Sequence, residues 1–301
     1  DALPIYTTTT INSDSPDPSV VGQPYTVAVT VAASVPGGGT PTGTVNVNDG
    51  TGGTCVVTLS GGTGSCNLTS TSAGAKTLTA TYVSTTNYNT SNGTATHQVS
   101  KADTTTAITG DTPDPSNPGQ AVAVTFTVTP VSPGAGTPTG NVTVSDGVNS
   151  CTGTVAAGTC NITLTTPGAR TLTATYASDS NFNGSTSAGV PHQVATPPTI
   201  AKSFAPTQIK VGETSVMTFN VTNPNSALAL SNISFNDTFP AGVEVNTPVV
   251  STNTCGGTLT PALTGGETSF SYSGGSLGFN GTCAISVQVK ATTAGVKNNT
   301  T

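Results

Sequence analysis

The six cysteines are the residues whose spacing points most directly to chemistry. An even count in a weakly charged, threonine-rich chain indicates an oxidising compartment, in which cysteines form disulfides. Two pairs, Cys55/Cys66 and Cys151/Cys160, stand at matching positions of an internal repeat, and each pair lies on neighbouring runs that it would clip as one hairpin. This leaves Cys255 to pair with Cys283. Zinc ligation is the alternative, but two cysteines per domain with so few histidines make a poor zinc set.

The two histidines and the aspartates give no catalytic constellation. His97 and His192 stand at equivalent repeat positions, a whole domain apart, so they cannot converge on one site. The sequence has no Gly-x-Ser-x-Gly elbow and no Asp-x-Asp-x-Asp-Gly calcium loop. Asp17 and Asp114 each stand between two prolines, which predicts a stiff turn. We therefore expect no catalytic residue, no metal site and no cofactor.

The composition excludes several classes of protein. Charged residues make up 7% of the 301 residues, where an ordinary soluble domain carries roughly 25%. The net charge of −6 comes from 13 acidic and 7 basic residues, so no basic patch is available for nucleic acid. The sequence contains no run of about 18 apolar residues, which is the length needed to span a bilayer. The chain begins at Asp1, which we interpret as a processed or excised piece of a secreted or cell-surface, extracellular protein.

An internal repeat determines the organisation of the chain. The sequence SPDPS at 15–19 recurs as TPDPS at 112–116, and GAKTLTATY at 74–82 recurs as GARTLTATY at 168–176. Short runs with alternating apolar residues predict strands at 25–31, 43–47, 55–59 and 76–82 of the first unit. Asp49 and Asp146 each precede a glycine, which predicts hairpin turns. Regularly spaced turn signals of this kind are typical of an all-β sandwich.

These motifs carry a resemblance to known families. Residues 7–195 resemble two tandem bacterial immunoglobulin-like repeats, through the TLTATY run followed by Asn-Tyr-Asn or Asn-Phe-Asn. The rest resembles a conserved repeat domain of unassigned function in bacterial surface proteins, with a Lys-x-Phe start, an Asp-Thr-x-Pro centre and an Asn-Thr end. The resemblance implies three tandem immunoglobulin-like β-sandwiches in an elongated rod. We expect an N-terminal extended arm at 1–6, repeat 1 at 7–100, repeat 2 at 101–196 and domain 3 at 197–301.

Domain 3 carries the sharpest chemical hypothesis. Lys202 stands in its first strand, Asp237 near its middle and Asn299 in its last strand, and the first and last strands of such a sandwich are neighbours. Burial disfavours the ammonium form of a lysine, and a buried carboxylic acid could polarise the asparagine amide. Attack of the amine would then form an intramolecular isopeptide bond, as the resemblance to Gram-positive pilins implies. Asn298 is an alternative acceptor, and a snorkelling Lys202 with a turn-capping Asp237 is the alternative interpretation.

These observations favour a non-enzymatic structural module of a bacterial extracellular stalk, adhesin or filament. The alternative is an adhesin module that binds a glycan or a cell-surface protein, for which Tyr6, Tyr88, Phe182 and Tyr272 are nearly the only aromatic candidates. We expect no nucleic-acid partner and no membrane span.

The two ends of the chain suggest a mode of assembly. Residues 1–10 could act as a donor-strand arm through Leu3, Ile5 and Tyr6, and domain 3 stops a few residues into the strand that should close it. An arm of one copy could fill the exposed sheet edge of the next. Such head-to-tail strand addition would build a fibre, whereas plain cut sites in a longer tandem array are the alternative.

Overall fold

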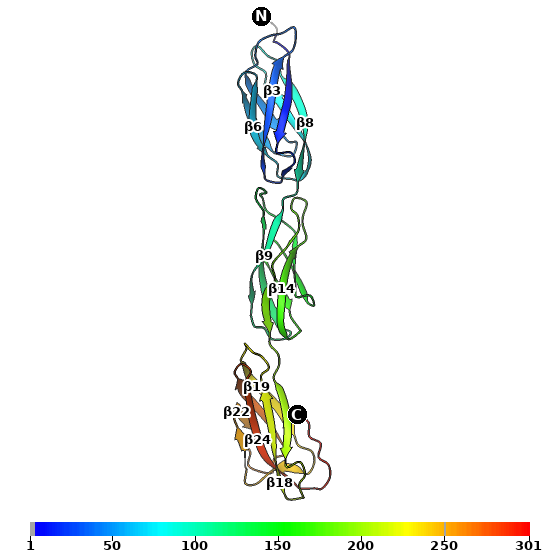
Figure 1. The fold of residues 1–301 in the computed structure, drawn as a ribbon, viewed down its shortest axis with the longest axis vertical. Helices are drawn as coiled ribbons and strands as arrows, with labels where there is room; N and C mark the ends of the chain where they lie inside the picture. The colour runs from blue at the N-terminus through cyan, green and yellow to red at the C-terminus, as the bar shows by residue number, and fades with distance from the viewer. Residues whose placement is uncertain (1–3, 250) are drawn as a thin grey trace. The chain divides into compact units, whose positions relative to one another are not determined.

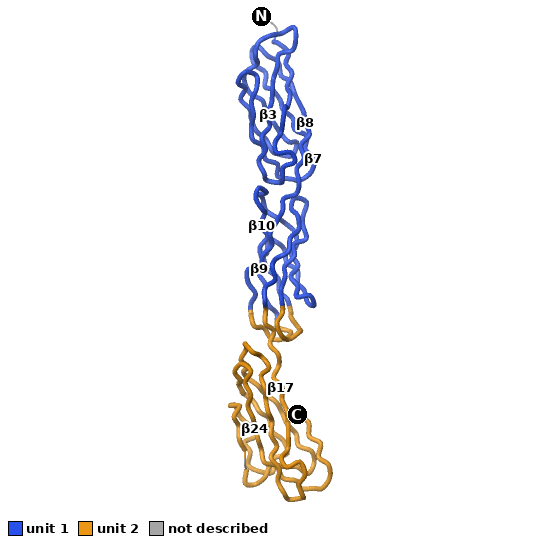
Figure 2. The backbone as a smooth tube through the Cα atoms, viewed as in Figure 1, with its two compact units in different colours: residues 1–112, 121–162, 171–191 blue, residues 113–120, 163–170, 192–301 orange. Residues whose placement is uncertain are grey.

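The structure is a computed structural model that describes residues 4–249 and 251–301. The described residues form 24 β-strands and no helix, so they contain no helix that could cross a membrane. The all-β class predicted from the sequence is confirmed. The chain divides into two compact units (Figure 2), of which unit 1 comprises residues 1–112, 121–162 and 171–191 and unit 2 comprises residues 113–120, 163–170 and 192–301.

Repeat 1 is a sandwich of two sheets, and three of its strands are labelled at the blue end of the chain in Figure 1. The smaller sheet has the strand order β1(Thr7–Ser15), β3(Pro24–Ala33), β6(Thr63–Thr69). The larger sheet has the order β2(Ser19–Val20), β8(Ser91–Ser100), β7(Gly74–Tyr82), β4(Gly43–Asn48), β5(Thr54–Leu59). The predicted strands are therefore present, each within a few residues of its expected bounds.

The alternation in the sequence explains why these segments pair as they do. Successive side chains of a strand point to opposite faces, and in β3 the buried positions are Tyr25, Val27, Val29 and Val31. They pack against the buried faces of β4 and β7 in one apolar cluster. The intervening threonines and alanines face outward, so this face of the sheet is uncharged.

Repeat 2 follows the same plan. One sheet has the order β13(Thr159–Thr163), β10(Ala121–Pro130), β9(Thr104–Thr112). The other has β12(Ser150–Thr154), β11(Asn141–Ser145), β14(Gly168–Tyr176), β15(Ser185–Thr186), with β16(Val190–Val194) also paired to β14. Asp49 and Asp146 lie in the β4–β5 and β11–β12 turns, where each carboxylate accepts backbone hydrogen bonds. The hairpins expected at these positions are present.

Domain 3 contains a second kind of sandwich. One sheet has the order β17(Thr199–Ala205), β18(Thr214–Thr222), β24(Thr282–Ala291), β20(Val243–Val245), with β21(Ser251–Asn253) also on β24. The other has β19(Leu230–Thr238), β23(Ser269–Leu277), β22(Gly256–Thr260). Its core is aromatic, with Phe219, Phe235, Phe270 and Tyr272 in mutual ring contact. The described residues after Ala291 form no strand, so the closing strand expected there is absent.

Within unit 1 the two repeats meet directly. The Ala135 N–H donates to the Val21 carbonyl over 3.1 Å, and the Ala73 N–H donates to the Asn181 side-chain oxygen over 3.0 Å. Gly22 adopts a positive φ of 80° beside this joint, and a Cβ on it would approach the Ala135 backbone to 2.3 Å. The short connection between the repeats is also held, because Ala102 is buried and bridges to Phe182.

The residues expected to form a free arm belong to repeat 1. Ile5 pairs with Tyr88, donating to the Asn87 carbonyl over 2.8 Å and accepting from the Asn89 N–H over 2.9 Å. Residues from Thr7 onward are β1, which pairs with β3 along its length. Tyr6 is 75% exposed, and Leu3 lies outside the described residues. In this chain the backbone of residues 5–10 is paired within repeat 1, so donation of these residues to another copy would require the release of that pairing.

Candidate functional site

Three polar residues from distant parts of domain 3 meet inside its sandwich. Lys202 lies in β17 and Asp237 in β19, which belong to different sheets, and Asn299 lies in the segment that follows β24. The Lys202 ammonium donates to one carboxylate oxygen of Asp237. The Asn299 amide nitrogen donates to the other over 2.8 Å. The Asp237 side chain is fully buried, so one carboxylate holds the amine and the amide beside each other.

Apolar side chains border this cluster on its inner side. The Lys202 nitrogen lies 5.3 Å from the centre of the Phe219 ring, and the Asn299 nitrogen also contacts the Met217 sulfur at 3.6 Å. Thr301 closes the cluster with a 2.6 Å hydrogen bond to the carboxylate. Among the described atoms the buried Asn299 carbonyl oxygen has no hydrogen-bond partner. An unpaired amide oxygen in an apolar site is an uncompensated polar group, and it belongs to the amide that the amine would attack.

The structure also distinguishes the two acceptor asparagines. Asn298 is exposed, whereas Asn299 reaches Asp237. Asn299 does so from a segment without strand pairing, so it does not lie in a closing strand as the sequence suggested. The three residues meet because Lys202 faces inward from an edge strand and the final segment passes over the open side of the sandwich.

The structure contains the three intradomain disulfides, Cys55–Cys66, Cys151–Cys160 and Cys255–Cys283. Their role differs from the one expected, because they do not clip hairpins within a sheet. Cys55 lies in β5 and Cys66 in β6, and these two strands belong to different sheets. Cys151 in β12 and Cys160 in β13 repeat that arrangement. Each bond in the repeats therefore ties the two layers of a sandwich together at one edge.

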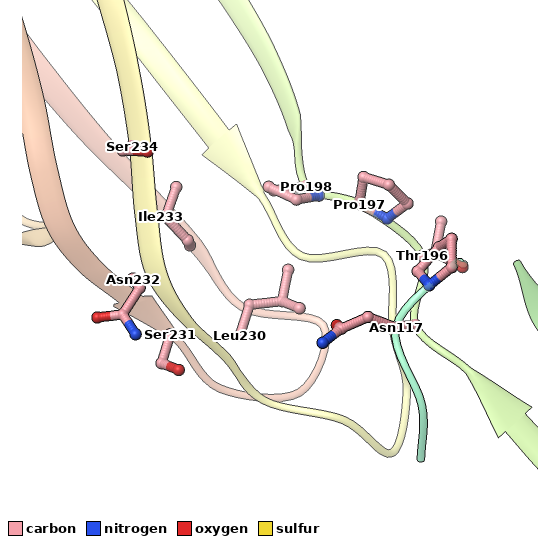
Figure 3. A pocket seen from close by; sticks show the side chains of 11 residues that line it. Asn117, Thr196, Pro197, Pro198, Leu230, Ser231, Asn232, Ile233 and Ser234 are labelled. Carbon is pink, nitrogen blue, oxygen red and sulfur yellow. The ribbon is translucent and has the colours of Figure 1, made fainter. Parts of the chain in front are cut away.

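Described residues of unit 2 line a pocket and a larger groove. A pocket of about 350 Å³ lies between the 196–198 segment with Asn117 on one side and residues 230–234 on the other (Figure 3). Its lining carries no titratable side chain. A larger groove of about 1070 Å³ runs beside the Lys202 cluster, lined by Phe204, Ile209, Val289 and Val296 among others. The smaller pocket has no titratable group. The groove combines these apolar side chains with Lys202, Lys210, Lys290, Lys297 and Asn299, so it opens onto the cluster itself.

Most of the aromatic residues considered for ligand binding are not accessible. Tyr88, Phe182 and Tyr272 are 9%, 3% and 1% exposed. Among the described residues, Tyr6 and Phe279 are the aromatic side chains that are largely exposed, at 75% and 62%, while Phe204 and Phe235 are partly buried. The Asn-rich loops around Tyr88 and Phe182 have the sequence of exposed loops, but both rings point inward and are buried.

The fold and the repeated disulfide arrangement define a tandem immunoglobulin-like β-sandwich protein. Residues 11–100 and 108–195 match the model of the Bacterial Ig-like domain (group 3). This covers more than half of the chain, which therefore belongs to the bacterial Ig-like domain (group 3) family. Residues 198–301 match a Domain of unknown function (DUF7933). Both resemblances drawn from the sequence are confirmed.

Several solved structures are similar to the chain. Invasin, a bacterial integrin-binding protein, is 13% identical with a TM-score of 0.46, over 97% of this chain and 56% of that one. FdeC, an Escherichia coli adhesin, is 14% identical with a TM-score of 0.29, over 95% and 88%. The Yersinia pseudotuberculosis adhesin InvE is 17% identical with a TM-score of 0.33, over 63% and 59%. The chain thus spans just over half of invasin. No curated protein matches it.

Proposed function

We propose that the chain is a non-enzymatic structural module of a bacterial extracellular stalk, adhesin or filament. The observation that carries the proposal is the joint between repeats 1 and 2, where backbone and side-chain hydrogen bonds replace a loose linker. Layer-crossing disulfides suit a module that must stay folded outside the cell. The burial of Tyr88, Phe182 and Tyr272 leaves little surface for the rival ligand-binding function.

A glycan array and a host-protein binding screen with the full chain separate the two functions. A structural module gives no specific hits in either screen. A specific ligand that Tyr6→Ala or Phe279→Ala abolishes would overturn the structural assignment, since these are the exposed aromatic side chains of the described residues.

We further propose that Lys202 and Asn299 form an isopeptide bond. The Lys202 nitrogen attacks the Asn299 amide carbon, the bond from that carbon to the amide nitrogen breaks, and ammonia leaves. Asp237 touches both nitrogens, so it is placed to take a proton from the attacking amine and to return it to the departing one.

Intact mass tests the bond directly, because loss of ammonia lowers the mass by about 17 Da while Asp237→Ala restores it. Stretching the chain between its ends gives a second readout. A bond from 202 to 299 shortens the extended chain by about 34 nm, at roughly 3.5 Å per residue. The matched control is Glu244→Gln, which removes an exposed ion pair with Lys290 in the same domain. If the unaltered chain shows no mass loss after correction for the disulfides, the isopeptide bond does not form.

Head-to-tail assembly is a separate proposal. The groove beside the Lys202 cluster offers apolar side chains to an incoming strand. Strand β17 lies at the edge of its sheet, so one side of its backbone is available to pair with a further strand. An arm donated by another copy must first release Ile5 from Asn87 and Asn89. Electron microscopy of the chain without residues 1–6 tests this, since fibres that form as well as before would exclude the arm as the connector.

A further inference from the structure

His97 of repeat 1 is a buried imidazole with polar groups at both ring nitrogens. It lies in β8 and is 1% exposed. Its Nδ1 is 2.7 Å from Asp14 Oδ2 and 3.5 Å from Asp17 Oδ1. Its Nε2 is 2.8 Å from the Ser19 hydroxyl, and the ring stacks on Tyr25 at 3.8 Å. The ring is therefore fixed in position, with one nitrogen directed at two carboxylates near the surface.

The three groups are spaced as metal ligands. Asp14, Asp17 and His97 each offer one ligand atom, and these atoms all lie within 4.8 Å of one another. Ligands of a tetrahedral zinc ion stand about 3.4 Å apart, given bonds of about 2.1 Å. Small side-chain movements convert one spacing to the other. A chain with only 13 acidic residues here places two carboxylates beside each other, and a cation would relieve their repulsion.

The partners of these groups support ligation. When the Nε2–H donates to Ser19, the lone pair of Nδ1 faces the carboxylates, which is the tautomer that a metal requires. The backbone N–H of Gln98 donates to Asp17 Oδ1 over 2.9 Å and holds that carboxylate in place. A metal ion bound at this lone pair would lie beside Asp14 Oδ2, on the side of the ring away from Ser19.

Repeat 2 preserves the arrangement. The Ser116 hydroxyl lies 2.9 Å from His192 Nε2, Asp114 Oδ1 lies 3.6 Å from His192 Nδ1, and the Gln193 N–H donates to Asp114. The sequence offset that relates Asp17 to Asp114 also relates Asp14 to Asp111. The position of Tyr25 is taken by Val122 in repeat 2.

We propose that each repeat binds one divalent transition-metal ion, with zinc the best fit, through Asp14, Asp17 and His97 in repeat 1 and the equivalent residues of repeat 2. An imidazole nitrogen with two carboxylate oxygens suits zinc, whereas calcium takes six to eight oxygen ligands. The expectation of no metal site followed from considering the aspartates and histidines separately. The bound ion would link the start of each repeat to its last strand, independently of the function proposed above.

Calorimetric titration of the tag-free, chelator-treated full chain with zinc chloride tests the sites. The expected result is two ions per chain, one after His97→Gln or His192→Gln, and none after both. Because His97→Gln could disturb the core, Asp17→Asn provides a second variant that leaves the ring in place and also removes one ion. Asp103→Asn makes the same charge change outside the site and keeps both ions.

Ser19→Ala tests the role of the hydroxyl, and about 10- to 100-fold weaker binding is expected in repeat 1 alone. Cobalt substitution gives an independent readout, since a tetrahedral site produces visible absorption that the double histidine variant loses. No binding of zinc chloride at millimolar concentration, or a stoichiometry that the histidine variants leave unchanged, would overturn the proposal.

Discussion

Repeat 1 and domain 3 close their sandwiches in different ways. In repeat 1 the last strand, β8, pairs with β7 through nine residues, from Ser91 to Val99. In domain 3 the final segment forms no strand, and its Asn299 and Thr301 bind the buried Asp237 instead. A ladder spreads closure over many backbone hydrogen bonds, whereas the cluster concentrates it on one carboxylate. Single side-chain changes should therefore damage domain 3 far more than the repeats.

The largest effect is expected from Asp237→Ala. Removing one partner of a buried ion pair leaves an uncompensated charge and costs about 3–5 kcal/mol. Calorimetric melting should show the domain 3 transition falling while the repeats melt unchanged, with Glu244→Gln as the surface control. A domain 3 transition that stays in place would mean that the final segment does not close the sandwich.

The disulfides should contribute in the order of their loop lengths. The chain-entropy estimate gives about 3.5 kcal/mol for a loop of 28 residues, as in Cys255–Cys283, and about 2.7 kcal/mol for loops of 11 or 9, as in the repeats. Paired Cys→Ser variants, followed by denaturant unfolding, measure this difference. Equal losses in all three domains would show that layer crossing matters more than loop length.

The two hairpin aspartates compare repeat 1 with repeat 2. Asp49 is 1% exposed and accepts hydrogen bonds from the Thr51 and Gly53 backbone and from Ser70. Asp146 is only half-buried. Alanine should cost about 2–3 kcal/mol at Asp49, because the buried Ser70 hydroxyl loses this acceptor. It should cost about 1 kcal/mol at Asp146, which accepts from the more exposed backbone of Val148 and Asn149. Amide exchange of the two turns would measure both, and a larger loss at Asp146 would contradict this account.

The smallest expected effect is on the stability of the folded state at low pH. Burial raises the pKa of Asp179, but hydrogen bonds from the Asn181 and Thr139 backbone outweigh it and hold the pKa at about 2. In domain 3 the hydroxyl of Thr264 holds the pKa of Glu267 at about 2. A lowered pKa stabilises the folded state above the unfolded value, so this contribution is lost as the pH falls from about 4 to about 2.

Asp179→Asn and Glu267→Gln should each remove less than about 1 kcal/mol of that acid-sensitive stability, because both groups are partly exposed. Melting at pH 7 and at pH 2.5 measures the difference. A variant that is more acid-sensitive than the unaltered chain would contradict the assignment.

The local periodicity of the sequence was sufficient to predict strands and their buried faces. The alternation at Tyr25 to Val31 and at Leu78 to Tyr82 was sufficient to predict two strands and their buried faces. Contacts between distant segments were harder. Asp14 and His97 are 83 residues apart and meet only because β1 and β8 lie against each other, and pairing of that kind depends on sheet partners rather than on local pattern.

Domain 3 shows the same limit. Lys202, Asp237 and Asn299 meet in the structure, but the final segment does not form the strand that the sequence suggested. Asn299 reaches the carboxylate without strand pairing, which no periodic pattern signals. The inward rotation of Tyr88 and Phe182 was likewise hidden, because their polar neighbours are typical of exposed loops.

The joint at Gly22 has a consequence for how such chains can evolve. A side chain at Gly22 would collide with the Ala135 backbone, whereas a Cβ on the equivalent Gly119 would meet no described atom within 4 Å. Repeat 1 and repeat 2 therefore differ at this glycine position in the space available for a side chain. A recombination event that exchanged or deleted one unit would have to preserve or rebuild this close contact. Lengthening of the array should proceed by copying a unit together with its matched neighbour.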